Sequence, residues 1–278
     1  YKPSTDKYSV GDKVPFQVKT AIPNYPADSK TATFEINDTP SAGLKIDTST
    51  IAVDGATASD YTLTASETGY KIAFKKDFVL AHPGQAITVT YKAELTKDAF
   101  FKSETDVTGN TATVKFNPNP YTDGTAEPDS KTKVYTFGYV FKKVNPQGQP
   151  LPGATFTLTL ANGQVLTSKS DDQGYVYFSG LAAGSYTVSE TGVPAGYQKV
   201  TPDPKFELNE GVCKGDNPAT ADVEDNYLVA TTNVEDPIQA ALPAAGGPGT
   251  LAIPAVGVIL LAVGGFVLVR TQGKKNAE

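Results

Sequence analysis

The sequence is poor in the residues that build catalytic, metal and disulfide sites. It has one cysteine, one histidine, no methionine and no tryptophan. With Cys213 alone, no disulfide can form within the chain, and we predict a loop thiol there. His82 stands in a turn-like Leu-Ala-His-Pro-Gly stretch without a nucleophile motif, and no metal-ligand spacing is present. These shortages predict a protein that is not an enzyme and holds no cofactor.

The chain also lacks an initiator methionine and a secretion signal at its start. We therefore expect the 278 residues to be the C-terminal part of a longer exported precursor. A formal net charge of −6 argues against nucleic acid as a partner. Glycine and proline are abundant, with 25 and 20 residues, beside many Thr, Val and Tyr. This composition favours short strands joined by turns, and the length suits about two domains.

The C-terminal region has three parts: a Leu-Pro-Ala-Ala-Gly stretch, an uncharged apolar run over 251–269, and a basic end. As a helix, the run would measure about 28 Å, close to the hydrocarbon thickness of a bilayer. The basic end predicts that the C-terminus lies in the cytoplasm and the rest outside the cell. We expect a sorting motif and spacer at 237–249, a transmembrane helix at 250–270 and a cytoplasmic tail at 271–278.

The order of these parts resembles the cell-wall sorting signal of Gram-positive surface proteins. In that family, a sortase cleaves a Leu-Pro-x-Thr-Gly motif after its fourth residue and joins the new carboxyl end to an amine. The resemblance assigns the motif to Leu242, Pro243, Ala244, Ala245 and Gly246. Alanine at position 245 departs from the usual threonine, which leaves the class of sortase open. A plain membrane anchor is the alternative for the apolar run.

Residues 1–120 contain several segments in which apolar residues alternate with polar ones, as in half-buried strands. Two such apolar faces carry a polar residue at one end. Asp38 continues the alternating positions of Phe34 and Ile36, so all three share one face of their segment. Asn110 shares the face of Val114 at the start of another segment. Both groups are either turned into the core or placed in turns near water, because an unpaired buried polar group costs about 1–3 kcal/mol.

This region resembles the middle domain of sortase-assembled pilin backbone subunits. The matching stretches are 8–16, 22–23, 38–44 and 110–114. In that family a lysine near the start of the domain joins an asparagine in the last strand, with an acid between them. The resemblance assigns the acid to Asp38 and the asparagine to Asn110. Lys2 is our choice for the lysine, and Lys7 is the alternative.

Residues 121–133 are rich in polar residues and lack an apolar period, so they predict a linker. A second domain is expected over 134–236. In its first strand every second residue from 135 to 141 is aromatic, and Lys143 continues that face. Glu190 follows Val188 on one face, and Asn233 shares a parity with Tyr227. Lys143 either faces the core or extends its amine to water from the end of the strand.

The second domain resembles the collagen-adhesin B-type domain, a seven-stranded immunoglobulin-like sandwich. The resemblance rests on Leu-Pro-Gly-Ala-Thr-Phe at 151–156, Glu-Thr at 190–191 and Pro-Ala-Gly-Tyr at 194–197. It implies a self-formed isopeptide bond between Lys143 and Asn233, assisted by Glu190. Apolar surroundings favour a neutral amine, which is a nucleophile, and a protonated acid, which can polarise the amide. Such a bond would offset the lack of disulfides.

Together these features predict an all-β chain with two tandem immunoglobulin-like sandwiches and a C-terminal transmembrane helix. The expected function is a structural subunit of a cell-wall-anchored pilus. Its expected partners are a sortase, neighbouring pilin subunits and peptidoglycan, with the membrane as a temporary hold before sorting. The alternative is the stalk of a monomeric wall-anchored adhesin that binds a host or matrix ligand.

Overall fold

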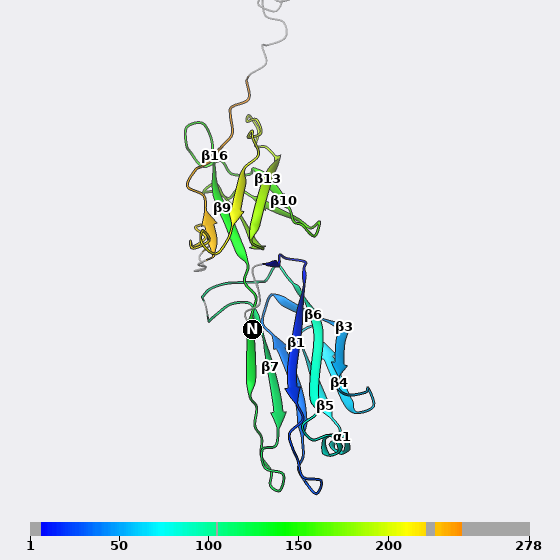
Figure 1. Ribbon diagram of the computed structural model, residues 1–278. Coiled ribbons are helices and arrows are strands. Elements are labelled where there is room, and N and C mark those ends of the chain that lie inside the picture. The colour runs from blue at the N-terminus through cyan, green and yellow to red at the C-terminus, as the bar shows by residue number, and fades with distance from the viewer. Residues whose placement is uncertain (1–6, 104, 221–225, 241–278) are drawn as a thin grey trace, which may run out of the picture. The chain divides into compact units, whose positions relative to one another are not determined.

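The computed structural model describes residues 7–103, 105–220 and 226–240. Within these residues the chain consists of strands and loops with one short helix, α1 (Lys76–Ala81). Residues 1–237 form one compact unit. It contains two hydrophobic cores, each enclosed by two sheets. The all-β prediction is therefore confirmed (Figure 1).

The first sandwich pairs a three-stranded sheet with a five-stranded one. The smaller sheet has the order β1 (Lys13–Ala21), β6 (Ala86–Leu95) and β3 (Leu44–Asp54). The larger has the order β4 (Tyr61–Ser66), β5 (Gly69–Phe74), β2 (Phe34–Pro40), β7 (Gly109–Phe116) and β8 (Asp129–Lys133). All strand pairs in this sandwich are antiparallel.

The predicted alternation places the expected side chains in the first core. In β2, Phe34, Ile36 and Asp38 are all buried, because successive side chains of a strand point to opposite faces. Asn110 is buried at the start of β7. The antiparallel register sets Asp38 opposite Ala112 and Pro40 opposite Asn110. This register brings the acid and the carboxamide to the same end of the sheet.

The prediction of a linker over residues 121–133 is wrong for the last five of these residues. Residues 129–133 form β8, which pairs with β7 along the edge of the larger sheet. The edge position explains the missing apolar period, because β8 has no buried residue and its polar side chains meet solvent. Ala126 also pairs with Phe116 through two backbone hydrogen bonds. The chain between the sandwiches is therefore shorter than the composition predicts.

The second sandwich is built around β9 (Phe137–Val144), which lies between β12 (Tyr175–Leu181) and β15 (Tyr227–Val229). A short strand, β16 (Val234–Glu235), also pairs with β9. The facing sheet has the order β11 (Val165–Lys169), β10 (Thr155–Thr159), β13 (Gly184–Gly192) and β14 (Lys205–Leu208). Both β15 and β16 run parallel to β9, so the last strands of the domain lie beside its first (Figure 1).

Several sequence predictions fall outside the described residues. These are Lys2, the motif at 242–246, the helix at 250–270 and the tail at 271–278. No helix in the part of the chain that the structure describes is both long and apolar enough to cross a membrane. Cys213, predicted as a loop thiol, does lie in a loop, but its side chain is buried in the second core.

Candidate functional site

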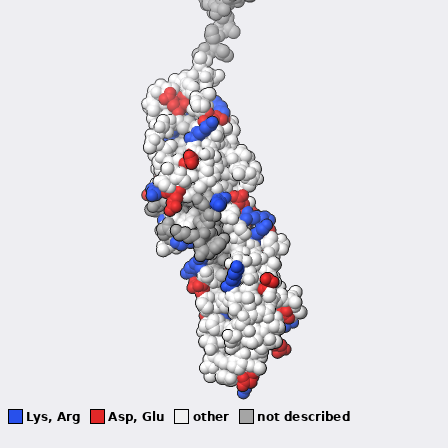
Figure 2. Space-filling model, viewed as in Figure 1, with Lys and Arg blue, Asp and Glu red and all other residues white. Residues whose placement is uncertain are grey.

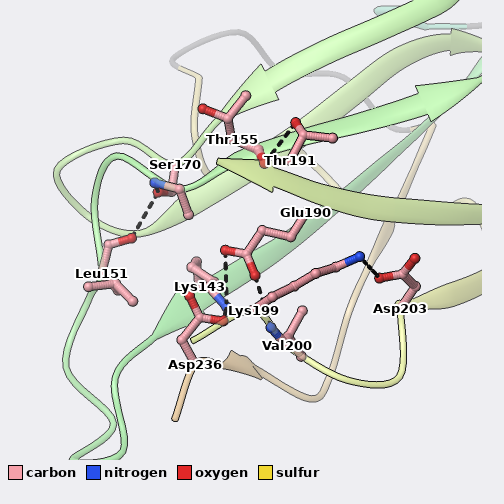
Figure 3. A network of polar contacts seen from close by, with 11 residues as sticks. Lys143, Leu151, Thr155, Ser170, Glu190, Thr191, Lys199, Val200, Asp203 and Asp236 are labelled. Carbon is pink, nitrogen blue, oxygen red and sulfur yellow. Dashed lines mark hydrogen bonds and ion pairs between the residues drawn. The ribbon is translucent and has the colours of Figure 1, made fainter. Parts of the chain in front are cut away.

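A lysine and two acids meet inside the second sandwich. Lys143, near the end of β9, is fully buried, and its Nζ donates a short hydrogen bond to Oδ1 of Asp236. Glu190 on β13 places its Oε1 3.8 Å from the same Nζ. The exposed fraction of each of these three residues is 4 % or less. The trio joins both sheets and the last described segment of the compact unit (Figure 3).

The backbone around Asp236 explains how the acid reaches the lysine. Val234 lies opposite Lys143 in the parallel register of β16 and β9, and the amide of Asp236 donates to the carbonyl of Val144 at 3.1 Å. Val234 and Asp236 are two residues apart, so their side chains point to the same face, and both are buried. Parallel pairing thus delivers the carboxyl of Asp236 beside the amine.

Burial raises the pKa of Glu190 to about 7. The hydrogen bond that Glu190 Oε2 accepts from the amide of Val200, at 3.0 Å, lowers the pKa, as does the charge of Lys143. The negative charge of the nearby Asp236 carboxylate raises the pKa. Near neutral pH, Glu190 can therefore both release and accept a proton, which suits a general acid and base.

Aromatic rings shield this trio from water. The Nζ of Lys143 lies 5.6 Å from the centre of the Phe156 ring, and Phe156 meets Phe141 edge to face. Within the described residues, Oε1 of Glu190 and Oδ2 of Asp236 have no hydrogen-bond partner. Unsatisfied buried oxygens are costly and mark sites where a structure sustains a chemical role.

Asn233, the predicted partner of Lys143, is exposed and lies outside this trio. The prediction assumed one unbroken strand from Tyr227 to residue 233, in which every second side chain faces the core. The strand is not continuous, because β15 ends at Val229, and the next four residues form no strand before β16. In β16 the buried parity is that of Val234, which turns Asn233 outward. The residue that meets Lys143 is Asp236.

A second polar cluster lies inside the first sandwich. Asp38 is 2 % exposed, and its Oδ2 accepts a hydrogen bond from Nδ2 of Asn110 at 2.8 Å. The hydroxyl of Tyr91, on β6 of the facing sheet, lies 2.9 and 3.0 Å from the two carboxylate oxygens. Burial raises the pKa of Asp38 to about 6, while the bonds from Asn110 and Tyr91 lower it. The sequence-predicted acid and amide are thus in direct contact.

Two buried atoms of this first cluster lack a hydrogen-bond partner among the described residues. They are Oδ1 of Asn110 and the hydroxyl of Tyr70, which stands opposite Asp38 in the β2–β5 register. Lys7, the alternative amine, is exposed and is not a hydrogen-bond partner of Asp38 or Asn110. Lys2 lies outside the described residues. The cluster therefore contains the acid and the amide of the predicted set, together with two polar atoms that have no partner among the described residues.

Sequence reasoning missed two residues that carry this geometry. Asp236 had a usable signal, since it follows Val234 by two positions in a strand-like stretch. Tyr91 had no such signal, because its contact with Asp38 joins strands from opposite sheets and leaves no mark in the sequence of either strand. Within the described ranges, no group of three or more His, Cys, Asp and Glu residues is arranged to hold a metal ion.

Comparison with known proteins identifies the fold. Residues 138–220 match the SpaA family model of a prealbumin-like fold domain. The T6 backbone pilin of Streptococcus pyogenes serotype M6 superposes with a TM-score of 0.70 at 15% identity, covering 84% of this chain and 67% of that one. The chain has the fold of pilus backbone proteins. The pilus 2b backbone protein of group B streptococcus gives a TM-score of 0.60 at 21% identity over 84% of this chain and 96% of its own.

A third pilus protein, the major pilin SpaD of Corynebacterium diphtheriae, superposes with a TM-score of 0.59 at 18% identity. It covers 84% of this chain, which spans 63% of that pilin. No curated protein sequence matches the chain. The family match contains Lys143 and Glu190 and stops before Asp236. Both members of the trio that lie within the matched region thus belong to the prealbumin-like part of the fold.

Proposed function

We propose that this chain is a structural subunit of a cell-wall-anchored pilus, not an enzyme. Each of its two sandwiches is closed by a covalent bond between a lysine and the side chain of an aspartate or asparagine. The observation that carries the proposal is the buried contact of Lys143 with Asp236 and Glu190, in a fold shared with pilus backbone proteins. The bond forms once per chain, so the chemistry is maturation.

In the second sandwich the reaction is a condensation of amine and carboxyl. Nζ of Lys143 attacks Cγ of Asp236, the Nζ–Cγ bond forms, and one Cγ–O bond breaks. Glu190 takes a proton from the amine and returns it to the leaving oxygen, which departs as water.

In the first sandwich the acceptor is an amide. An amine, which we assign to Lys2, attacks Cγ of Asn110, and the side-chain nitrogen leaves as ammonia. Asp38 carries the proton from the amine to that nitrogen. Two observations support the assignment: Asp38 already contacts Asn110 at 2.8 Å, and Oδ1 of Asn110 has no partner among the described residues.

The covalent bonds suit a filament under tension. Lys143 and Asp236 are 93 residues apart in the chain and lie at the first and last strands of their sandwich. A bond between them transmits force from one strand to the other without loading the residues between. For a loop of about this length, the chain-entropy model for a crosslink predicts roughly 4–5 kcal/mol of stabilisation.

The assembly proposal adds the C-terminal motif. A sortase cuts between Ala245 and Gly246 and joins the chain to a neighbouring pilin subunit or to peptidoglycan. The protein then resides outside the cell, attached to the wall. On the face shown in Figure 2, basic and acidic side chains are interspersed and form no basic field of the kind that nucleic acid would need.

Intact mass of residues 1–241 tests the covalent chemistry. The bond at Asp236 removes one water, about 18 Da, and the bond at Asn110 removes one ammonia, about 17 Da. We expect a total deficit of about 35 Da. A Lys143→Arg variant should lack the deficit of about 18 Da from the second sandwich and keep the deficit of about 17 Da from the first. A wild-type mass equal to the sequence mass would refute both bonds.

Cell-wall extraction tests the assembly. Denaturing electrophoresis of wall fractions should give a ladder of heavy bands that resist detergent, because sortase joins the subunits covalently. Replacing Leu242 and Pro243 together by alanine should abolish the ladder. A single band of the monomer in the wild type would instead indicate the stalk of a wall-anchored adhesin.

A further inference from the structure

One loop contacts Glu190 and the residue that follows Asp236. In the segment 198–200, the amide of Val200 donates to Glu190, and the amide of Gln198 donates to the carbonyl of Pro237 at 2.8 Å. Pro237 directly follows Asp236. The two amides are two residues apart, so the loop holds Glu190 with one and the end of the Asp236 segment with the other.

Asp203 anchors this loop to the strand that carries Glu190. Its Oδ1 lies 2.8 Å from Nζ of Lys199, the residue between the two donating amides. Its Oδ2 accepts a hydrogen bond from the hydroxyl of Ser189 at 2.7 Å. Ser189 precedes Glu190 on β13. Asp203 thus ties together Ser189 and Lys199, the two residues that neighbour the Glu190–Val200 hydrogen bond. Figure 3 shows its contact with Lys199.

Asp203 accepts from two donors and is therefore not an isolated surface ion pair. The side chains of Lys199 and Asp203 are 44% and 29% exposed, and an isolated pair at such exposure contributes little to stability. Here the carboxylate has a second donor in Ser189, which fixes its orientation. The hydrogen bonds from Lys199 and Ser189 lower the pKa of Asp203, so the anchor remains ionised at neutral pH.

We infer that Asp203 is a positioning residue for the bond between Lys143 and Asp236. It holds the segment 198–200 so that Val200 orients Glu190 toward the amine and Gln198 fixes the chain beside Asp236. The inference rests on the proposed crosslink and adds the residue that sets its geometry. Asp203 does not touch the reacting atoms and acts through the two backbone amides.

The pH dependence of bond formation distinguishes positioning from general support. The groups that face Glu190 are Lys143 on β9, Asp236 after β16 and the amide of Val200. The Val200 amide favours the charged form of Glu190. Releasing the loop removes that donor, so Glu190 should stay protonated to higher pH. A residue that only supports the fold would leave the pH profile of the reaction in place.

The experiment compares Asp203→Ala with the wild type and with Asp172→Ala. Asp172 is an exposed aspartate of the same sandwich that makes no hydrogen bond or ion pair with the described residues, so it controls for loss of a surface charge. Each full chain is synthesised in vitro, held unfolded in urea and diluted into buffers from about pH 5 to about pH 9. The branched peptide that joins Lys143 to Asp236 is quantified by mass spectrometry over time.

We expect Asp203→Ala to form the bond roughly tenfold more slowly than the wild type, since small misplacement of reacting groups is costly. The fall of its rate at low pH should begin at a higher pH than in the wild type, because Glu190 must be ionised to take the proton of the amine. Asp172→Ala should match the wild type in both respects. Circular dichroism of Asp203→Ala in a Lys143→Arg background establishes that the variant folds.

Two results overturn the inference while leaving the proposed crosslink intact. One is an Asp203→Ala rate equal to that of Asp172→Ala. The other is a slower rate with an unmoved pH profile, which would mean that Asp203 supports only the fold. If the wild type itself never yields the branched peptide, the proposed crosslink fails and the inference with it.

Discussion

The two sandwiches bury similar sets of polar side chains but hold them differently. In the first, Asp38 is oriented by a side chain, the hydroxyl of Tyr91 from the facing sheet. In the second, Glu190 is oriented by a backbone amide on a loop. The proposed acceptor is an asparagine in the first and an aspartate in the second. The comparison shows that a buried acid can be oriented either by packing between sheets or by a loop.

The two sites also differ in how much of the reacting set is in contact. In the second sandwich, an oxygen of Glu190 and an oxygen of Asp236 both lie within 4 Å of Nζ of Lys143. In the first, the helper acid and the acceptor meet, and the amine is assigned to a residue outside the described range. Substitutions at the two sites should therefore change bond formation and stability in different ways.

The largest effect is expected from Asp236→Ala. It removes the crosslink, worth roughly 4–5 kcal/mol for a loop of this length. It also leaves the buried Lys143 without its nearest partner, and breaking a buried pair costs about 3–5 kcal/mol. The second sandwich should become protease-sensitive, with its melting temperature lowered by roughly 20 °C or more. Calorimetry and limited proteolysis measure both changes.

Asn233→Ala is the matched control for Asp236→Ala. Asn233 is exposed, so its loss should change neither the melting temperature nor the mass deficit. The opposite pattern, a bond retained in Asp236→Ala and lost in Asn233→Ala, would restore the asparagine as the partner of Lys143.

The next effect concerns pH and sharpens the contrast between the helper acids. Burial raises the pKa of Asp38 from 3.8 to about 6, so between these values the folded state binds a proton that the unfolded state lacks. The unfolding free energy of a Lys2→Met chain, which has no first crosslink, should therefore fall as pH rises from about 4 to about 6. A shift of this size corresponds to about 3 kcal/mol.

Urea unfolding of the first sandwich at several pH values measures this slope. Asp38→Asn in the same background has no carboxyl to titrate and should flatten it. A slope that survives in Asp38→Asn would assign the pH dependence to another group.

A smaller effect should separate the two tyrosines of the first cluster. Tyr91 donates to the carboxylate, and a hydrogen bond to a charged group contributes about 1.5–3 kcal/mol. Tyr91→Phe should lower the unfolding free energy by about that amount in the Lys2→Met chain. Tyr70→Phe removes a buried hydroxyl without a hydrogen-bond partner among the described residues, so it should be neutral. Equal losses in the two variants would contradict the role of Tyr91.

The smallest effect is expected from Asp236→Asn, which gives the second site the acceptor of the first. The bond should still form, with ammonia as the leaving group, so the deficit at this site should drop from about 18 to about 17 Da. Stability should remain near that of the wild type because the crosslink is the same amide. High-resolution mass spectrometry measures the change, and an unlinked second sandwich in this variant would show that the site requires a carboxyl.

The sequence predicts these sites well where strands are regular. Strand alternation placed Asp38, Asn110 and Glu190 at the ends of apolar faces, and the structure shows all three buried. Lys143 likewise continues the aromatic face of β9, and the family resemblance assigned the roles of all four residues. In each case a polar residue continues an apolar face, and the strand geometry alone turns it inward.

The prediction fails where the chain leaves regular pairing. Between β15 and β16 the strand is interrupted, so the parity counted from Tyr227 no longer holds at Asn233. The edge strand β8 was missed because both of its faces meet solvent and no apolar period remains. The contact of Tyr91 with Asp38 depends on how two sheets pack, and strand periodicity carries no information about the facing layer.

The branched peptide from the second sandwich tests the central claim most directly. Protease digestion of the wild-type chain followed by tandem mass spectrometry should yield one species in which the side chains of Lys143 and Asp236 are joined, lighter by about 18 Da than its two parts. Recovery of the two peptides unlinked, each with its full mass, would contradict the account.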